Sequence, residues 1–177
     1  MKHSIFSVFL SAILTLTAFS SQEPNDWKIS DAYSLKFETS YADGEFTAVN
    51  GTVLFDEQNL KTSKFDITID VGSISTGNSL KDKHAKKDKW FGADKYPTIQ
   101  FKSSNISKTG TGYKVVGNLE LHGVKKEITI PFTFINDIFS GGFTINRLDY
   151  KVGTDTGFSS IVGTDIKIEL SVPVVRK

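Results

Sequence analysis

The chain lacks cysteine altogether and carries no excess charge of either sign. Without cysteine there are no disulfide bonds, no thiolate-ligated metals and no residue for a cysteine-linked lipid anchor. The 21 basic and 20 acidic residues leave a net charge of +1, whereas nucleic-acid binding needs a concentrated positive field. We therefore expect no nucleic-acid partner, and a fold that its apolar core alone must stabilise.

Histidine is almost as scarce. His84 and His122 are the only histidines after residue 21, and zinc sites generally use three or four protein ligands. Asp82 and His84 lie two positions apart, which on a helix directs them to different faces and argues against an acid–base pair. The sequence also lacks Gly-x-Ser-x-Gly, phosphate-loop and His-Glu-x-x-His motifs. We expect no catalytic residue, no metal and no cofactor.

Long apolar runs are absent except near the N-terminus. The stretch from Ile5 to Phe19 is interrupted only by Ser and Thr, and polar residues follow from Gln22. A membrane-spanning helix needs about 20 apolar residues, so this run is short. With small Ala18 and Ser20 before a cleavage site, it predicts a secretory signal peptide at residues 1–21. A retained anchor is the alternative. We expect one mature domain at residues 22–177, soluble and periplasmic or secreted.

What the chain does contain is a repeated alternation of apolar and polar residues. Phe65, Ile67 and Ile69, for example, alternate with Asp66 and Thr68. This period of two is typical of strands with one buried face. We predict eight antiparallel strands, at residues 33–38, 45–56, 64–71, 97–106, 113–121, 127–134, 142–151 and 166–174. A closed barrel and a β-sandwich both agree with this pattern.

One connection, from Gly72 to Tyr96, is much longer than the others. Asn78 and Ser79 are good helix caps, and Asp82 follows Ser79 at the spacing of a capping box, which predicts a short helix. The segment mixes polar and apolar side chains and ends in Trp90-Phe91. Such chemistry suits a place where a polar head group meets an apolar tail. Alternatively, the two aromatic rings simply fix the helix to the barrel.

Several segments carry a family resemblance, in order along the chain. One group comprises Val71 to His84, Trp90-Phe91 and Lys95 to Phe101. The others are Trp27-Lys28-Ile29, Gly44-Glu45-Phe46, Gly51-Thr52-Val53 with Phe55-Asp56, Asn118 to Val124, and Ile145 to Tyr150. Together these segments resemble the YceI-like family of periplasmic lipid-binding proteins. The resemblance implies an all-β, eight-stranded antiparallel lipocalin-like barrel with one short helical insertion around residues 78–91.

The same resemblance implies a bound lipid and no other cofactor. The expected partner is an amphiphilic lipid, above all a polyisoprenoid such as an isoprenoid quinone or a polyprenyl phosphate, with fatty-acid derivatives as further candidates. The barrel would sequester or transport this lipid in its interior. The sequence leaves open a homodimer and a transient contact with a membrane.

The 14 phenylalanines supply the main positive evidence for such an interior. Each one by itself is ordinary core, but together they suit a long apolar chain, for which shape matters more than directed hydrogen bonds. Inside the barrel we expect ligand contacts from Phe37, Phe46, Ile67, Ile69, Phe101, Leu119, Phe132, Phe134, Phe143 and Ile145. At the entrance we expect head-group contacts from Lys81, Asp82, His84, Trp90, Phe91 and Arg147.

Arg147 has two interpretations. Strict alternation places Arg147 and Asp149 inside the barrel beside Ile145, and a buried charge is costly unless it is paired. The simpler interpretation is therefore an internal Arg147–Asp149 pair, or a register bulge. The functional interpretation is that Arg147 contacts a head group such as a phosphate.

The sequence leaves two other classes of protein open. One is an enzyme that acts on such a lipid near His84 or Arg147. The other is a barrel with a filled core that serves only as an interaction or stress-response module. An interior packed tightly by its own side chains would favour the second.

Overall fold

A computed structural model describes residues 25–154 and 156–177, so the predicted signal peptide lies outside the described residues. The strands are β1 (Asp26–Ile29), β2 (Ser34–Glu38), β3 (Asp43–Phe46), β4 (Val49–Leu54), β5 (Lys64–Asp70), β6 (Ile74–Ser75), β7 (Thr98–Lys108), β8 (Tyr113–Leu121), β9 (Val124–Ile135), β10 (Ile138–Asn146) and β11 (Asp165–Arg176). The helices are α1 (Ser79–Ala85) and the short 3-10 helices η1 (Val71–Ser73), η2 (Arg147–Tyr150) and η3 (Gly157–Val162). Within the described part of the chain, no helix is long and apolar enough to cross a membrane.

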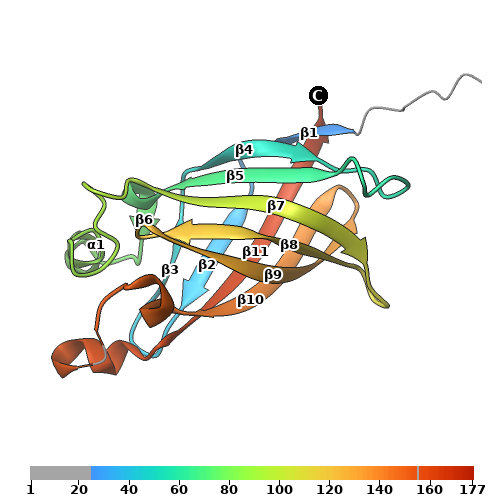
Figure 1. Ribbon diagram of the computed structural model, residues 1–177. Coiled ribbons are helices and arrows are strands. Elements are labelled where there is room, and N and C mark those ends of the chain that lie inside the picture. Colours follow the sequence, from blue (N-terminus) through green and yellow to red (C-terminus); the bar gives the residue numbers. More distant parts are fainter. Residues whose placement is uncertain (1–24, 155) are drawn as a thin grey trace, which may run out of the picture.

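The strands form one antiparallel sheet that closes on itself (Figure 1). The hydrogen-bonded order is β1-β4-β5-β7-β8-β9-β10-β11, and β1 then pairs with β11. β2 continues along the same edge of β11 beyond β1, β3 pairs with β2, and β6 pairs with β3. β1/β2, β3/β4 and β5/β6 are thus three bent strands, which together with β7 to β11 make a barrel of eight. The predicted eight-stranded antiparallel barrel with one helical insertion is confirmed.

Several predicted strand boundaries are wrong; the range 142–151, for example, begins at Ile138 in β10. The range 45–56 is interrupted at Thr47 and Ala48, where the wall bends between β3 and β4. The range 142–151 ends at Asn146, because the Asn146 side chain accepts a hydrogen bond from the Leu148 amide at 3.0 Å and caps η2. A local side-chain cap of this kind competes with the sheet ladder, and strand periodicity does not reveal it.

The two ends of the barrel differ (Figure 1). α1, η2 and η3 gather at one end, which we call the mouth, whereas the β7–β8 and β9–β10 hairpins lie at the other end, the closed end. The β7–β8 and β9–β10 connections are tight hairpins, whereas the longer β4–β5 connection, residues 55–63, also lies at the closed end and supplies Phe55 to it. The long connections at residues 71–97 and 147–164 contribute to the mouth.

An aromatic cluster fills the closed end. Phe55 is 1% exposed, and its ring centroid lies 5.1 to 6.1 Å from five other rings, those of Phe65, Tyr113, Phe132, Phe134 and Phe139. The Trp27 indole N–H donates to the Phe55 carbonyl at 3.0 Å. Edge-to-face pairs at these separations contribute beyond the area they bury. The cluster therefore acts as the hydrophobic floor of the barrel.

Tyr113, at the edge of this floor, has a distinctive titration. Burial, together with a 2.6 Å hydrogen bond from its hydroxyl to Glu57 Oε1, raises its pKa to about 12. Because the fold favours the neutral phenol, the stability that Tyr113 contributes is complete below pH 10, its ordinary pKa, and is lost as the pH rises through about 12. We expect Tyr113 to be the last tyrosine to ionise in a phenolate absorbance titration. In Tyr113→Phe this latest transition should disappear, and its persistence would show that another tyrosine is responsible.

Candidate ligand-binding mouth and barrel interior

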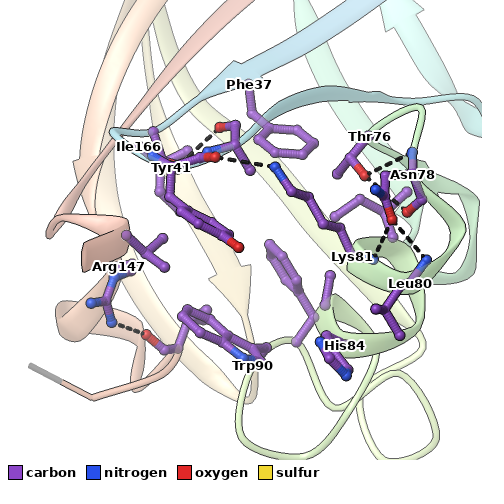
Figure 2. A pocket seen from close by; sticks show the side chains of 17 residues that line it. Phe37, Tyr41, Thr76, Asn78, Leu80, Lys81, His84, Trp90, Arg147 and Ile166 are labelled. Carbon is purple, nitrogen blue, oxygen red and sulfur yellow. Dashed lines mark hydrogen bonds between the residues drawn. The ribbon is translucent and has the colours of Figure 1, made fainter. Parts of the chain in front are cut away.

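A cavity of about 400 Å³ opens at the mouth. We call it the mouth cavity. Three segments surround it: the β2–β3 turn with Tyr41 and Ala42, the stretch from Ile74 through α1 to Phe91, and the η2–η3 region with Arg147, Val152 and Val162 (Figure 2). Phe37 and Ile166 form its barrel side. Most lining side chains are apolar or aromatic, and the volume lies within the usual range of ligand pockets, about 300–1,000 Å³.

α1 begins at Asn78, whose Oδ1 accepts from the amides of Leu80 and Lys81 at 3.0 and 3.2 Å. Asp82 instead accepts from the hydroxyl and the amide of Thr76, at 2.6 and 2.8 Å. The predicted helix cap at Asn78 is confirmed, but the capping box between Ser79 and Asp82 is wrong, since Asp82 is turned back to the loop before the helix. These hydrogen bonds from Thr76 lower the pKa of the Asp82 carboxyl.

Arg147 is the most deeply buried charged side chain among the described residues, at 1% exposed. Its guanidinium donates to four backbone carbonyls, those of Val152, Thr154, Ser159 and Gly163, at 2.5 to 2.8 Å. These acceptors belong to three separate stretches of the η2–η3 region. Arg147 is therefore a clamp that fixes this side of the mouth.

The predicted Arg147–Asp149 pair is wrong. Asp149 lies on the surface, with its side chain 56% exposed, and pairs with Lys126 at 2.9 Å. The reason is the change from strand to 3-10 helix at Arg147, which ends the two-residue alternation. Arg147 stays inside, whereas Asp149 points outward.

Trp90 links the clamp to α1. The Arg147 guanidinium lies 5.5 Å from the centre of the Trp90 ring system, a favourable cation–π arrangement. Gly153 has a φ of +69°, and a Cβ at this position would lie 2.8 Å from both Arg147 Nη1 and Trp90. Only glycine lets the backbone approach so closely, and its amide donates to the Lys89 carbonyl at 2.8 Å.

The β2–β3 turn is tied to both of its neighbours around the mouth. The Ser40 hydroxyl donates to the Ile161 carbonyl at 2.9 Å. Lys81 Nζ donates to the Tyr41 carbonyl at 3.3 Å and lies 4.5 Å from the Tyr41 ring centre (Figure 2). The mouth is thus a ring of three segments, joined by these two side-chain to backbone bonds and by the backbone bond from Gly153 to Lys89. Lys81 and His84 stand at its polar rim, and Phe91 and Ile74 line its apolar wall.

A second cavity of about 150 Å³ lies deeper, inside the barrel, and its lining consists of apolar and aromatic side chains. The inward residues of single strands show that it follows the mouth cavity along the barrel. On β11, Ile166 lines the mouth cavity whereas Leu170 and Val172 line the inner one. On β2, Phe37 and Leu35 show the same succession.

A packed layer separates the two cavities. Phe46 and Ile145, both 8% exposed, line neither cavity. The Phe46 ring lies 5.8 Å from that of Phe37 and 5.9 Å from that of Phe91. An apolar chain longer than the mouth cavity would have to displace this layer to reach the inner cavity.

The structure brings most of the predicted site residues to one of the two cavities. Those that line the mouth cavity are Phe37, Lys81, His84, Trp90, Phe91 and Arg147. Those that line the inner cavity are Ile67, Ile69, Phe101, Leu119, Phe132 and Phe143. Phe46 and Ile145 belong to the separating layer, Phe134 belongs to the aromatic floor, and Asp82 supports α1 from outside the lining. Their roles toward a ligand stay predictions.

Sequence reasoning missed part of the mouth. Thr39, Tyr41, Ala42, Val152 and Val162 all line it, yet they lie in turns and 3-10 segments without any periodic pattern. The one available signal was loop length, since the residues between Asn146 and Asp165 form a long connection. Among the described residues, no group of three or more histidine, aspartate or glutamate side chains is arranged to hold a metal.

Fold and site together define a small antiparallel β-barrel, closed by an aromatic floor at one end and opening into an apolar cavity at the other. Comparison with known proteins agrees with this architecture. The chain belongs to the YceI-like family, because the family's YceI-like domain model matches residues 23–174.

Individual relatives extend the match. A UPF0312 protein of Yersinia enterocolitica is 33% identical over 147 residues, which cover 77% of this chain and 75% of that protein. The crystal structure of Burkholderia cenocepacia BcnA superposes with a TM-score of 0.76 at 27% identity, over 83% of this chain and 99% of that one. A polyisoprenoid binding domain from Saccharophagus degradans shares the fold, with a TM-score of 0.62 at 14% identity over 85% and 98% of the two chains.

Proposed function

We propose that this protein binds an amphiphilic lipid, with the tail inside the barrel and the polar head at the mouth. The observation that carries the proposal is the pair of apolar cavities, about 400 and 150 Å³, in succession behind a rim that bears Lys81 and His84. Each methylene that leaves water contributes about 0.8 kcal/mol. A long tail is therefore held without directed chemistry, and a few polar groups suffice to orient the head.

A polyisoprenoid is the lipid that we propose, such as an isoprenoid quinone or a polyprenyl phosphate. The Saccharophagus degradans domain, which shares this fold, is described as a polyisoprenoid binding domain, and this supports the choice. The interior is lined by phenyl rings and β-branched side chains. The branched methyl groups of an isoprenoid tail can interdigitate with these side chains at the packing density of a protein core. Fatty-acid derivatives are the second choice.

Binding without catalysis is the activity that the site supports best. The unfilled space argues against a barrel that serves only as an interaction module, since such a module gains nothing from leaving its core incompletely packed. Arg147, the strongest candidate for an electrophilic contact, has its guanidinium engaged with four carbonyls of the mouth. We also propose export from the cytoplasm, on the strength of the apolar run from Ile5 to Phe19.

Mass spectrometry of an organic extract of the purified protein tests the ligand directly. We expect a polyisoprenoid in the wild-type extract. In Ile166→Trp the new indole should fill the mouth cavity, and in Leu119→Trp it should fill the inner one, so both variants should lose most of the lipid. If the core were fully packed, with no cavity to hold the indole, either substitution would instead lower the free energy of unfolding by about 1–3 kcal/mol.

Neighbouring outward residues provide matched controls. Lys167→Trp and Glu120→Trp add the same side chain to the same strands on the solvent face, and both should retain the wild-type lipid content. Loss of lipid in Ile166→Trp alone would confine the tail to the mouth cavity. Unchanged lipid in both folded inward variants, or no lipid in the wild-type extract, would contradict the proposal.

A further inference from the structure

Large apolar side chains are exposed at the mouth more than elsewhere. Of the five that are exposed among the described residues, three lie there on three different segments: Tyr41 at 42%, Leu80 at 60% and Ile161 at 47%. The other two, Ile135 and Val175, lie toward the opposite end of the barrel. Scattered exposed apolar residues are ordinary, but a group around the opening of an apolar cavity indicates an interaction surface.

Basic side chains flank this apolar group on the α1 side. From Ser79 to Lys95 the chain has six lysines and three aspartates, a local charge of +3 (6 − 3). Lys83, Lys86 and Lys87 line the outer side of α1 together with Asp70 and Asp94, away from the mouth cavity. One of the three aspartates, Asp82, is held back by Thr76. The carboxylates of Glu38, Asp43, Glu45 and Glu169 lie instead on the outer wall around β2, β3 and β11.

We infer that the mouth docks on an anionic phospholipid bilayer, with the α1 side turned toward the head groups. Short apolar anchors flanked by lysines match the interface of a bilayer, where the anchors enter the acyl boundary and the cations stay among the phosphates. Among the carboxylates near the Tyr41 turn, Glu38 pairs with Lys167, as does Glu169, which reduces their repulsion from the phosphates. This surface extends the proposed function, because a lipid could pass between bilayer and barrel without crossing water.

A bilayer fits these residues better than an acidic protein. The three anchors stand on separate segments around an opening and do not form one continuous flat patch, whereas protein interfaces need a packed, complementary core. A fluid surface imposes no such requirement. An acidic protein partner is therefore the competing outcome of the test.

Vesicle flotation of the lipid-extracted protein tests the inference. The vesicles contain phosphatidylcholine alone or mixed with phosphatidylglycerol. We expect binding to the mixed vesicles only, and weaker binding as salt screens the lysines. Each lysine near an anionic surface contributes about 1 kcal/mol, or about a fivefold change in affinity. Lys83→Glu combined with Lys87→Glu should therefore weaken binding at least 25-fold, and Ile161→Asp should weaken it as well.

Matched changes at the closed end serve as controls. Ile135→Asp, and Lys108→Glu combined with Lys114→Glu, alter exposed residues of the far hairpins and should bind vesicles like the wild type. The inference would be overturned if the mouth variants and the control variants lost vesicle binding equally. It would also be overturned if the wild type bound both kinds of vesicle equally, or if it bound no vesicles but was retained on an acidic protein column. Lipid content of the same preparations before extraction reports separately on the proposed function. A wild-type protein that binds vesicles but carries no lipid would contradict the function alone.

Discussion

Replacement of Phe55 by alanine is expected to lower the free energy of unfolding by about 3–5 kcal/mol. Phe55 is 1% exposed and its ring contacts five others in the aromatic floor. Deleting the ring removes its transfer free energy and leaves a cavity that the five neighbouring rings, fixed on the four strands β5, β8, β9 and β10, cannot close. Urea denaturation monitored by circular dichroism measures the change.

Ile135→Ala is the matched control for this measurement. Ile135 lies at the same end of the barrel, but its side chain is 63% exposed, so its truncation should change stability by no more than about 0.5 kcal/mol. Similar losses in the two variants would show that the aromatic floor is not the stabilising centre of the closed end.

The second large effect is expected at the mouth. Arg147→Met removes the donors of four backbone carbonyls, and each buried acceptor left without a partner costs about 1–3 kcal/mol. We expect a loss of about 3 kcal/mol or more, together with faster amide hydrogen exchange in η2, η3 and the residues between them. Arg147→Lys should restore only part of this stability, because one ammonium group cannot reproduce the planar fork that reaches four carbonyls.

Arg176 provides the comparison for Arg147, since it is the other arginine of the chain. It is exposed and lies 5.3 Å from the centre of the Trp27 ring system. Arg176→Met should therefore cost at most about 1 kcal/mol. If the hydrogen exchange of η2 and η3 were unchanged in Arg147→Met, Arg147 would not be the clamp of the mouth.

The family and the barrel could be predicted because their signals are local. The alternation from Phe65 to Val71, or from Ile166 to Val174, depends only on which face of a strand is buried, and each short turn implies an antiparallel neighbour. The motifs of the YceI-like family settled the choice between barrel and sandwich, which alternation leaves open. The interior location of Ile67, Phe101 and Leu119 followed from the same periodicity.

The site could be predicted only in part. The long connection with Lys81, His84 and Trp90 was visible as an exception to the strand pattern, and these side chains do line the mouth cavity. Strand alternation predicted that Arg147 lies inside the barrel. Arg147 is indeed buried, but alternation is not the reason, because the Asn146 cap ends the strand before it. A local turn of this kind changes which side chains point inward without changing the apolar pattern.

By itself, the sequence determined the antiparallel strands, their apolar inner face and the position of the helical insertion, because these follow from side-chain periodicity and turn residues. The closure of the wall into a barrel followed from the motifs of the YceI-like family. Only the tertiary structure decided that the interior divides into two cavities at Phe46 and Ile145, that aromatic rings close one end, and that Tyr41, Val152 and Val162 meet at the other. Cavities are the space left between side chains from strands far apart in sequence. Their size and division depend on how those side chains pack, and no local pattern records this.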